Sequence, residues 1–266
     1  MKKVLALALI CAVSSFAAWD LFPLKEVGKG EAKLGLEYDI PAEKTSYLGI
    51  NLGARYSVIE GLEVALMFNN APGGYVVKSN EPEPVASVVE IPDKTGLNQP
   101  ILGVRYWMPL GIGVFADLTL PFGSKDLVGD KPNLALSIGG QYSTKFNEDL
   151  SLGSEVSFNK EFYDTLGVIL GIAVELDYSL GSITPYFAVD ISTEIIAGSE
   201  VDVPRQGAGA KREAEPTPTD VGISIGATYD ISESLYAAAG LRIGISGDAN
   251  RDYRPITINV DVGYNF

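Results

Sequence analysis

After residue 18, apolar and polar residues alternate with a period of two through most of the chain. Every second residue is apolar in residues 166–178, and the same pattern holds in residues 255–266. Successive side chains of a β-strand point to opposite faces, whereas an α-helix repeats its apolar face every three or four residues. The alternation therefore predicts an all-β chain whose strands each have one apolar face. Apolar runs in this part of the sequence stay well short of the roughly 18 residues that a membrane-spanning helix needs.

A second regularity indicates how many strands there are. Six tyrosines fall on the apolar face near the end of a predicted strand: Tyr56, Tyr106, Tyr142, Tyr178, Tyr229 and Tyr264. The intervals between them are 50, 36, 36, 51 and 35 residues, and a tight turn follows each of the first five. The shorter interval fits one pair of strands with its connections, and the two longer intervals contain the long segments 70–99 and 197–220. Six such tyrosines on alternate strands predict twelve strands.

These strands are joined alternately by long connections and tight turns. They are expected at residues 31–39, 46–57, 61–70, 100–108, 111–121, 133–144, 150–160, 166–179, 182–196, 221–230, 235–246 and 255–266. Long loops then gather at one end and short turns at the other, which is the layout of an antiparallel up-and-down β-barrel.

Alternation alone does not say whether the apolar face points inward, as in a soluble barrel, or outward, as in a membrane barrel. The apolar faces run for about five to seven positions, which on tilted strands matches an apolar band about 25 Å tall. Tyrosine side chains at equivalent strand ends suit a membrane–water boundary. The opposite faces carry Gly, Ala, Ser and Thr with scattered charges. These features favour a transmembrane β-barrel of about twelve strands.

The first eighteen residues have the pattern of a secretory signal peptide. Lys2 and Lys3 precede the apolar run 4–13, and small residues precede a cleavage position after Ala17 or Ala18. The chain's one cysteine, Cys11, lies in this leader, so disulfides are not expected in the mature protein. We expect a cleaved leader at 1–18, a periplasmic segment at 19–30 that is either a tail or a short plug, and the barrel at 31–266.

The last strand ends in Tyr264 and Phe266, after the alternating apolar residues Ile256, Ile258, Val260 and Val262. With the leader and the tyrosine repeat, this ending resembles the Gram-negative outer-membrane β-barrel proteins, which include the porins. The resemblance implies export to the outer membrane, contact with outer-membrane lipid, and assembly by the barrel-assembly machinery, which would read Tyr264 and Phe266 as its signal. It also implies that the six tyrosines form an aromatic ring at the membrane boundary.

If the apolar face meets lipid, the other face lines the lumen. Its charged residues are expected to be Arg55, Glu63, Arg105, Asp117, Glu155, Glu175, Asp177, Asp190, Arg242 and Asp261, together with Lys33 and Glu37. Acids outnumber bases in this set, and many of the remaining residues on this face are small. A wide, mildly acidic lumen would favour cations, because charged rings set the selectivity of a pore.

The alternative is that the charges pair with one another and fill the barrel. Arg55 would face Glu63 if Ser57 pairs with Gly61, and Arg242 would face Asp261 if Ser246 pairs with Thr257. Opposite charges directly across two strands stabilise a sheet modestly.

The composition limits the function. The formal charge of −14 opposes binding to nucleic acid, and the absence of histidine removes the usual general base of hydrolases and the commonest zinc ligand. We therefore expect no enzyme, no catalytic residue, no metal site and no cofactor. Two functions remain. One is a small passive channel for ions or small polar solutes, and the other is a non-conducting scaffold or adhesin that acts through the long loops 70–99 and 197–220.

Overall fold

The computed structural model describes residues 21–24, 26–40, 45–76, 96–97, 99–124, 134–162, 167–196, 219–246 and 256–266. The predicted leader lies outside this part of the chain, as does most of the two long predicted loops. In the part that is described, no helix is long and apolar enough to cross a membrane.

One antiparallel sheet accounts for nearly all the described residues. Its strands are β1 (Gly30–Ile40), β2 (Thr45–Ile59), β3 (Leu62–Val76), β4 (Gly96–Leu97), β5 (Ile101–Met108), β6 (Ile112–Thr119), β7 (Ala135–Lys145), β8 (Leu150–Glu161), β9 (Val168–Tyr178), β10 (Ile183–Ile196), β11 (Asp220–Asp230), β12 (Leu235–Ser246) and β13 (Ile256–Asn265). A short 3-10 turn, Pro109–Gly111, joins β5 to β6.

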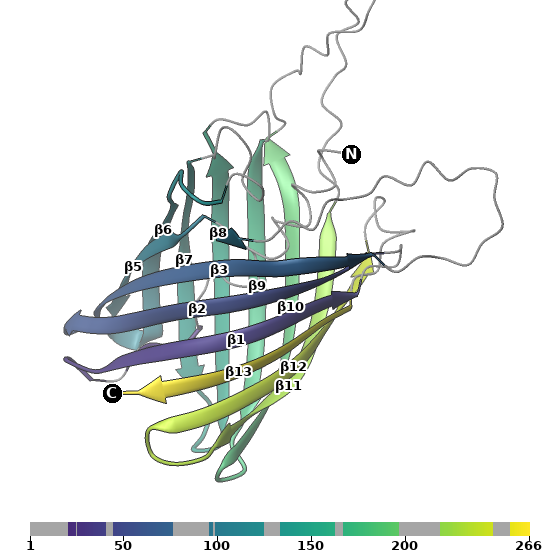
Figure 1. The fold of residues 1–266 in the computed structure, drawn as a ribbon. Helices are drawn as coiled ribbons and strands as arrows, with labels where there is room; N and C mark the ends of the chain where they lie inside the picture. The colour runs from purple at the N-terminus through teal and green to yellow at the C-terminus, as the bar shows by residue number, and fades with distance from the viewer. Residues whose placement is uncertain are drawn as a thin grey trace, which may run out of the picture.

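The sheet closes on itself. Neighbouring strands pair in chain order, and β1 pairs with β2 on one side and with β13 on the other. Because β4 adds only two residues beside β3, twelve strands form the ring. Figure 1 shows the strongly tilted strands, with the short turns gathered at the lower edge. We call that edge the short-turn end. The predicted twelve-stranded antiparallel barrel is confirmed.

The predicted strand limits agree with the structure within a few residues, with one exception at β3. This strand was expected to end at residue 70 and instead continues to Val76. Its added residues pair with the start of β2, where Tyr47 lies opposite Gly74 and Thr45 opposite Val76. The loop predicted at 70–99 is therefore shorter, and it also contains β4.

The apolar side chains lie on the outside of the barrel. Large outward residues such as Leu52, Val104 and Ile225 are 42–52% exposed, whereas the inward Arg105 and Glu63 are 2% and 3% exposed. Soluble proteins rarely expose apolar surface on this scale. The apolar face therefore points outward, as expected of a transmembrane barrel and not of a soluble one.

All six repeated tyrosines lie on the outer face, and their exposed fractions range from 41% to 51%. They lie at the short-turn end. Tyr106, for example, pairs with Leu62 at the start of β3, and Tyr229 pairs with Ile183 at the start of β10. The six side chains therefore ring one end of the barrel.

Inward aromatic side chains lie across from glycines on the next strand. Four such pairs stand directly opposite each other: Trp107–Gly113, Phe115–Gly139, Tyr186–Gly226 and Tyr236–Gly263. A Cβ atom built on any of these glycines would lie within 3.0 Å of the paired ring. The glycines thus give the rings room to lie flat along the wall.

Candidate permeation lumen

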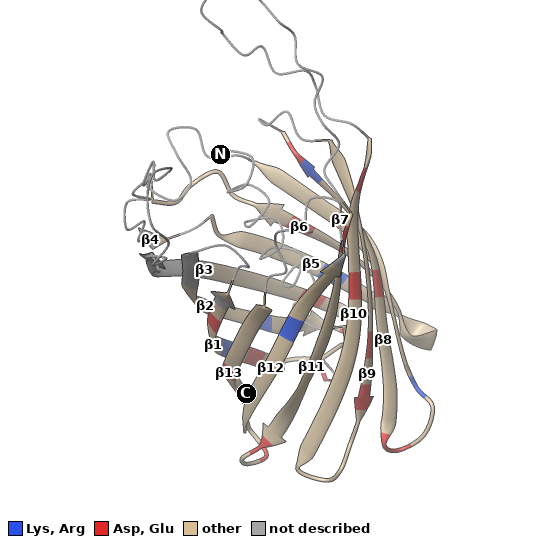
Figure 2. Cartoon of the chain, turned by 90° about the vertical axis from the view of Figure 1, so that its right-hand side faces the viewer, with Lys and Arg blue, Asp and Glu red and all other residues tan. Residues whose placement is uncertain are grey.

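All ten predicted lumen residues lie on the inner face. The two parts of the wall differ in how deeply these residues are buried. Seven are buried, namely Arg55, Glu63, Arg105, Asp117, Glu155, Arg242 and Asp261. Glu175, Asp177 and Asp190, on β9 and β10, are half-buried. Figure 2 shows the charged residues of the barrel as isolated bands on strands that are mostly uncharged.

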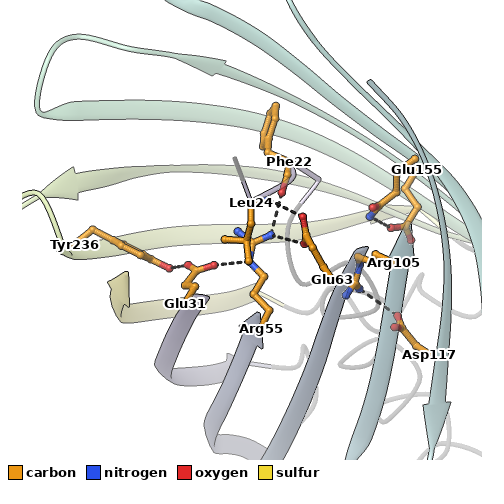
Figure 3. A network of polar contacts seen from close by, with 10 residues as sticks. Phe22, Leu24, Glu31, Arg55, Glu63, Arg105, Asp117, Glu155 and Tyr236 are labelled. Carbon is orange, nitrogen blue, oxygen red and sulfur yellow. Dashed lines mark hydrogen bonds and ion pairs between the residues drawn. The ribbon is translucent and has the colours of Figure 1, made fainter. Parts of the chain in front are cut away.

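The first cluster of charges lies at the short-turn end of β1–β3 (Figure 3). Arg55 lies directly opposite Glu31, and its Nε donates to Glu31 Oε2 at 2.6 Å. The Tyr236 hydroxyl donates to the other oxygen of Glu31. Arg55 Nη1 is 3.8 Å from Glu63 Oε2, so Arg55 lies between two carboxylates.

The predicted direct opposition of Arg55 and Glu63 is wrong. Ser57 lies opposite Glu63, and Arg55 lies opposite Ala65. The turn is tighter than expected, because Ile59 pairs with Leu62 and the ladder shifts between Ser57 and Ile59. Arg55 and Glu63 therefore meet diagonally.

Residues 21–24 lie inside this cluster. Arg55 Nη1 donates to the carbonyl oxygen of Phe22 at 2.9 Å, and the backbone N–H of Leu24 donates to Glu63 Oε1 at 2.7 Å. Leu21 is only 7% exposed and lies beside Gly153 of β8. In contrast, residues 26–29 are exposed, and the Gly28 N–H donates to the Ser57 carbonyl at 2.8 Å. The segment predicted as a tail or a plug thus has its first described residues against the inner face.

A second cluster covers the wall from β5 to β8. Arg105 Nη2 lies 3.3 Å from Asp117 Oδ2, and the guanidinium lies 5.7 Å from the centroid of the Phe115 ring. Gln141 Nε2 donates to Glu155 Oε2 at 2.8 Å. Charged and aromatic side chains together fill this side of the lumen.

The third cluster centres on Arg242 of β12. Its Nε donates to Asp190 Oδ1 at 3.0 Å, and its Nη2 donates to Asp220 Oδ2 at 2.8 Å and to Asp190 Oδ2. The prediction that Arg242 faces Asp261 across the ladder is wrong. Arg242 lies opposite Thr257, whereas Asp261 lies opposite Ala238. The ladder between β12 and β13 begins at Ile243 and Ile256, so the connection is longer than the predicted pairing of Ser246 with Thr257 allowed.

Sequence reasoning missed three inner residues whose side chains bind the arginine clusters: Glu31, Asp220 and Tyr236. Glu31 and Tyr236 could have been found from the alternation, since they share a face with Lys33 and with Arg242. Asp220 precedes the predicted strand 221–230 by one residue, so its inclusion depends on the strand limit. Among the described residues, no group of three or more Asp, Glu or Cys is placed to hold a metal ion.

The lumen is filled unevenly. On β3–β6 the inner face carries large buried side chains, including Met67, Ile101, Trp107 and Phe115. On β9–β12 many inner residues are small and half-buried, including Ala173, Ala188, Ser224, Gly226 and Ala238. Solvent therefore reaches the inner face on the β9–β12 side, where Glu175, Asp177 and Asp190 lie.

No protein-family model and no curated protein sequence matches the chain. Solved structures do. The COG4313 outer membrane channel from Pseudomonas putida F1 matches with a TM-score of 0.71 and 11% identity, covering 93% of this chain and 98% of that one. The NanC porin matches with a TM-score of 0.57 and 8% identity, covering 88% of this chain and 98% of that one. The translocator domain of the autotransporter NalP from Neisseria meningitidis matches with a TM-score of 0.57 and 10% identity, covering 100% of this chain and 98% of that one. The chain thus has the fold of the outer-membrane β-barrels.

Proposed function

We propose that the protein is a passive outer-membrane channel for small cations and small polar solutes. The observation that carries the proposal is the half-buried inner wall of β9 and β10, on which Glu175, Asp177 and Asp190 stand among small residues. A solvent-reached acidic wall inside a closed barrel is the arrangement that a cation-preferring pore requires.

The other inner charges support the same selectivity. Each of the three buried arginines in the clusters lies close to a carboxylate, and Arg55 and Arg242 each contact two. Glu31 and Asp220 add two acids to the predicted set. Because low-dielectric walls strengthen the field of such charges, the lumen should concentrate cations and repel anions.

The proposal includes the cellular context. We propose that residues 1–18 direct export, that Tyr264 and Phe266 are read by the assembly machinery, and that the six outward tyrosines lie at the periplasmic boundary of the outer membrane. The shared fold supports this location, since the COG4313 protein and NanC are described as an outer membrane channel and a porin. No catalytic role is part of the proposal.

The test is the reversal potential across a planar bilayer under a KCl gradient, with the full chain exported in a Gram-negative host and purified from its outer membrane. The wild-type protein should show discrete steps with cation preference. Two unit charges 4 Å apart interact by about 1 kcal/mol in water, which is about fivefold in the local concentration of an ion. An acid attracts the cation and repels the anion, so each neutralised acid should lower the cation-to-anion permeability ratio by at most about 25-fold. Glu175→Gln combined with Asp177→Asn should therefore move the reversal potential towards zero.

The matched control is Glu148→Gln combined with Asp149→Asn, which removes the same two charges from an exposed turn outside the lumen. It should leave the reversal potential close to the wild-type value. A folded protein without conductance would refute the channel and favour the non-conducting scaffold or adhesin. An equal shift in the control and in the β9 double variant would refute the assignment of selectivity to the β9 wall.

A further inference from the structure

We propose that residues 21–24 form a strap that crosses the lumen at the short-turn end and limits the size of the solutes that pass. The inference rests on the proposed channel function and names the element that sets its size limit.

The crossing follows from the positions of the strap's contacts. Leu21 lies against Gly153 of β8, whereas Phe22 and Leu24 bind side chains of β2 and β3. Going around the ring through β3, β5, β6 and β7, β8 is the fifth strand from β2, in a ring of twelve. A segment that touches nearly opposite walls within four residues must run through the interior. The strap therefore crosses the interior of the barrel from β2 and β3 to β8.

The contacts also show where the strap lies along the barrel axis. Glu63 is the second residue of β3, and Gly153 is the fourth residue of β8. Arg55 lies four residues before the end of β2. All three positions are close to the short turns, so the strap lies at that mouth of the barrel.

Two buried charges hold the strap by its backbone. Arg55 and Glu63 are 6% and 3% exposed, and they bind the Phe22 carbonyl and the Leu24 N–H respectively. Hydrogen bonds to ionised groups are roughly twice as strong as neutral ones. They bind main-chain atoms, so the anchoring does not depend on which side chains the strap carries. Arg55 and Glu63 are thus positioning residues for the strap.

Gly153 provides the site for the other end of the strap. A Cβ atom at Gly153 would lie 2.6 Å from Leu21 Cβ and 3.3 Å from Phe22 Cζ. A bulky residue such as leucine at this position would push the strap off β8. The residues directly opposite Gly153 on the two neighbouring strands are Ser143 and Glu175, so the nearest atoms to its Cβ position come from the strap and not from a ring across the ladder.

The first test measures conductance and size limit together. Deletion of residues 21–24 should raise the single-channel conductance by about twofold, because the strap divides a mouth that is about 1.5 times as wide as that of a side-chain-filled eight-stranded barrel. Liposome swelling should then admit a trisaccharide such as raffinose that the wild-type protein excludes. Gly153→Leu should act in the same direction. Gly140→Leu is its matched control, because the Cβ position at Gly140 has only one atom within 4 Å, at 3.7 Å.

The second test addresses the anchors. Glu63→Ala should raise conductance towards the deletion value, whereas Glu63→Gln should restore the wild-type value, since the amide oxygen still accepts from the Leu24 N–H. If Glu63 had only a structural role, the Glu63→Ala and Glu63→Gln proteins would have the same solute size limit.

The third test locates the strap without conductance. Leu21→Cys is combined with Gly153→Cys, in a chain whose other cysteine lies in the proposed leader. The two Cβ positions are 2.6 Å apart, so the strap must move by only about 1 Å to reach the roughly 3.8 Å Cβ separation of a disulfide. The disulfide should form and be seen as altered mobility on non-reducing gels. No crosslink in folded protein would overturn the crossing. Equal conductance and size limit for the deletion and the wild type would overturn the strap's role while the channel stands. If neither protein conducts, the channel function fails, and the size-limiting role fails with it.

Discussion

At the scale of single residues, the inner face is organised around arginines that each lie near a carboxylate. Arg242 shows the arrangement most clearly, because one guanidinium serves both Asp190 and Asp220 from two neighbouring strands. The planar fork of arginine can bind two carboxylates at once, which a lysine ammonium does with poorer geometry. Such a residue joins three strands inside the barrel in addition to the backbone ladder.

Arg242→Ala is expected to lower the free energy of unfolding by about 3 kcal/mol, because it leaves the buried Asp220 and the half-buried Asp190 without their cation. The measurement is the urea midpoint of the protein in lipid vesicles, followed by tryptophan fluorescence. Arg242→Lys should fall between the alanine variant and the wild type. An unchanged midpoint for the alanine variant would mean that water replaces the guanidinium without cost.

At the scale of strands, the wall is packed by placing an aromatic ring over a glycine of the neighbouring strand. Phe115 covers Gly139, Tyr186 covers Gly226 and Tyr236 covers Gly263. Rings that lie over glycines restore side-chain packing that the glycine itself lacks. The inner glycines are therefore partners of particular rings rather than points of weakness in the sheet.

Two adjacent glycines in β7 allow this to be tested. A Cβ at Gly139 would lie 2.3 Å from the Val156 carbonyl oxygen and 2.6 Å from the Phe115 ring, whereas the nearest atom to a Cβ at Gly140 is the Gly113 carbonyl oxygen, 3.7 Å away. Gly139→Ala should destabilise the barrel by about 1–3 kcal/mol through overpacking. Gly140→Ala should leave the unfolding midpoint nearly unchanged. Equal effects of the two substitutions in the same urea titration would refute a role for the ring.

The alternation was sufficient to predict which face each strand residue occupies, but not the pairing register. A shift of register by two or four residues leaves every side chain on its own face, so the apolar pattern does not oppose it. The prediction for Arg55 was two residues away from the structure, and that for Arg242 was four away. Both arginines were correctly placed inside, and both were given the wrong partner across the ladder.

The N-terminal segment could not be placed from the sequence for a different reason. Its anchors act on the backbone of Phe22 and Leu24, so no charge or motif in the segment itself marks the contact. The extension of β3 to Val76 was missed because its proline and two glycines are typical of loops. In both places tertiary contacts decided the structure.

At the scale of the whole molecule, the barrel is closed by joining the two ends of the chain. Phe266 and Gly30 exchange two backbone hydrogen bonds of 2.9 Å, and β1 and β13 pair from Glu31 to Ile40. The Phe266 ring stacks on Tyr264 with centroids 6.4 Å apart, and it remains 48% exposed on the outside. The contact that closes the barrel is therefore made mostly by main-chain atoms, and the Phe266 ring remains available to another molecule.

Phe266→Ala should lower the amount of folded protein in the outer membrane several-fold, measured as the band that shifts on boiling in a detergent gel. Refolding of the same variant into detergent micelles should be nearly normal, because the backbone bonds to Gly30 remain. A defect in micelles as large as that in cells would assign the ring a structural role. Normal amounts in cells would show that the assembly machinery does not depend on it.

The pairing of β1 with β13 also sets an order in time. A ribosome releases β1 first and β13 last, so the first strand waits for one of its two neighbours until residues 256–265 have been synthesised. Until then its outward leucines and its open hydrogen-bonding edge have no native partner, and exposed edges of this kind recruit other chains. The barrel can therefore close only after residues 256–265 have been synthesised. The export that we propose would have to deliver the polypeptide unfolded and shielded.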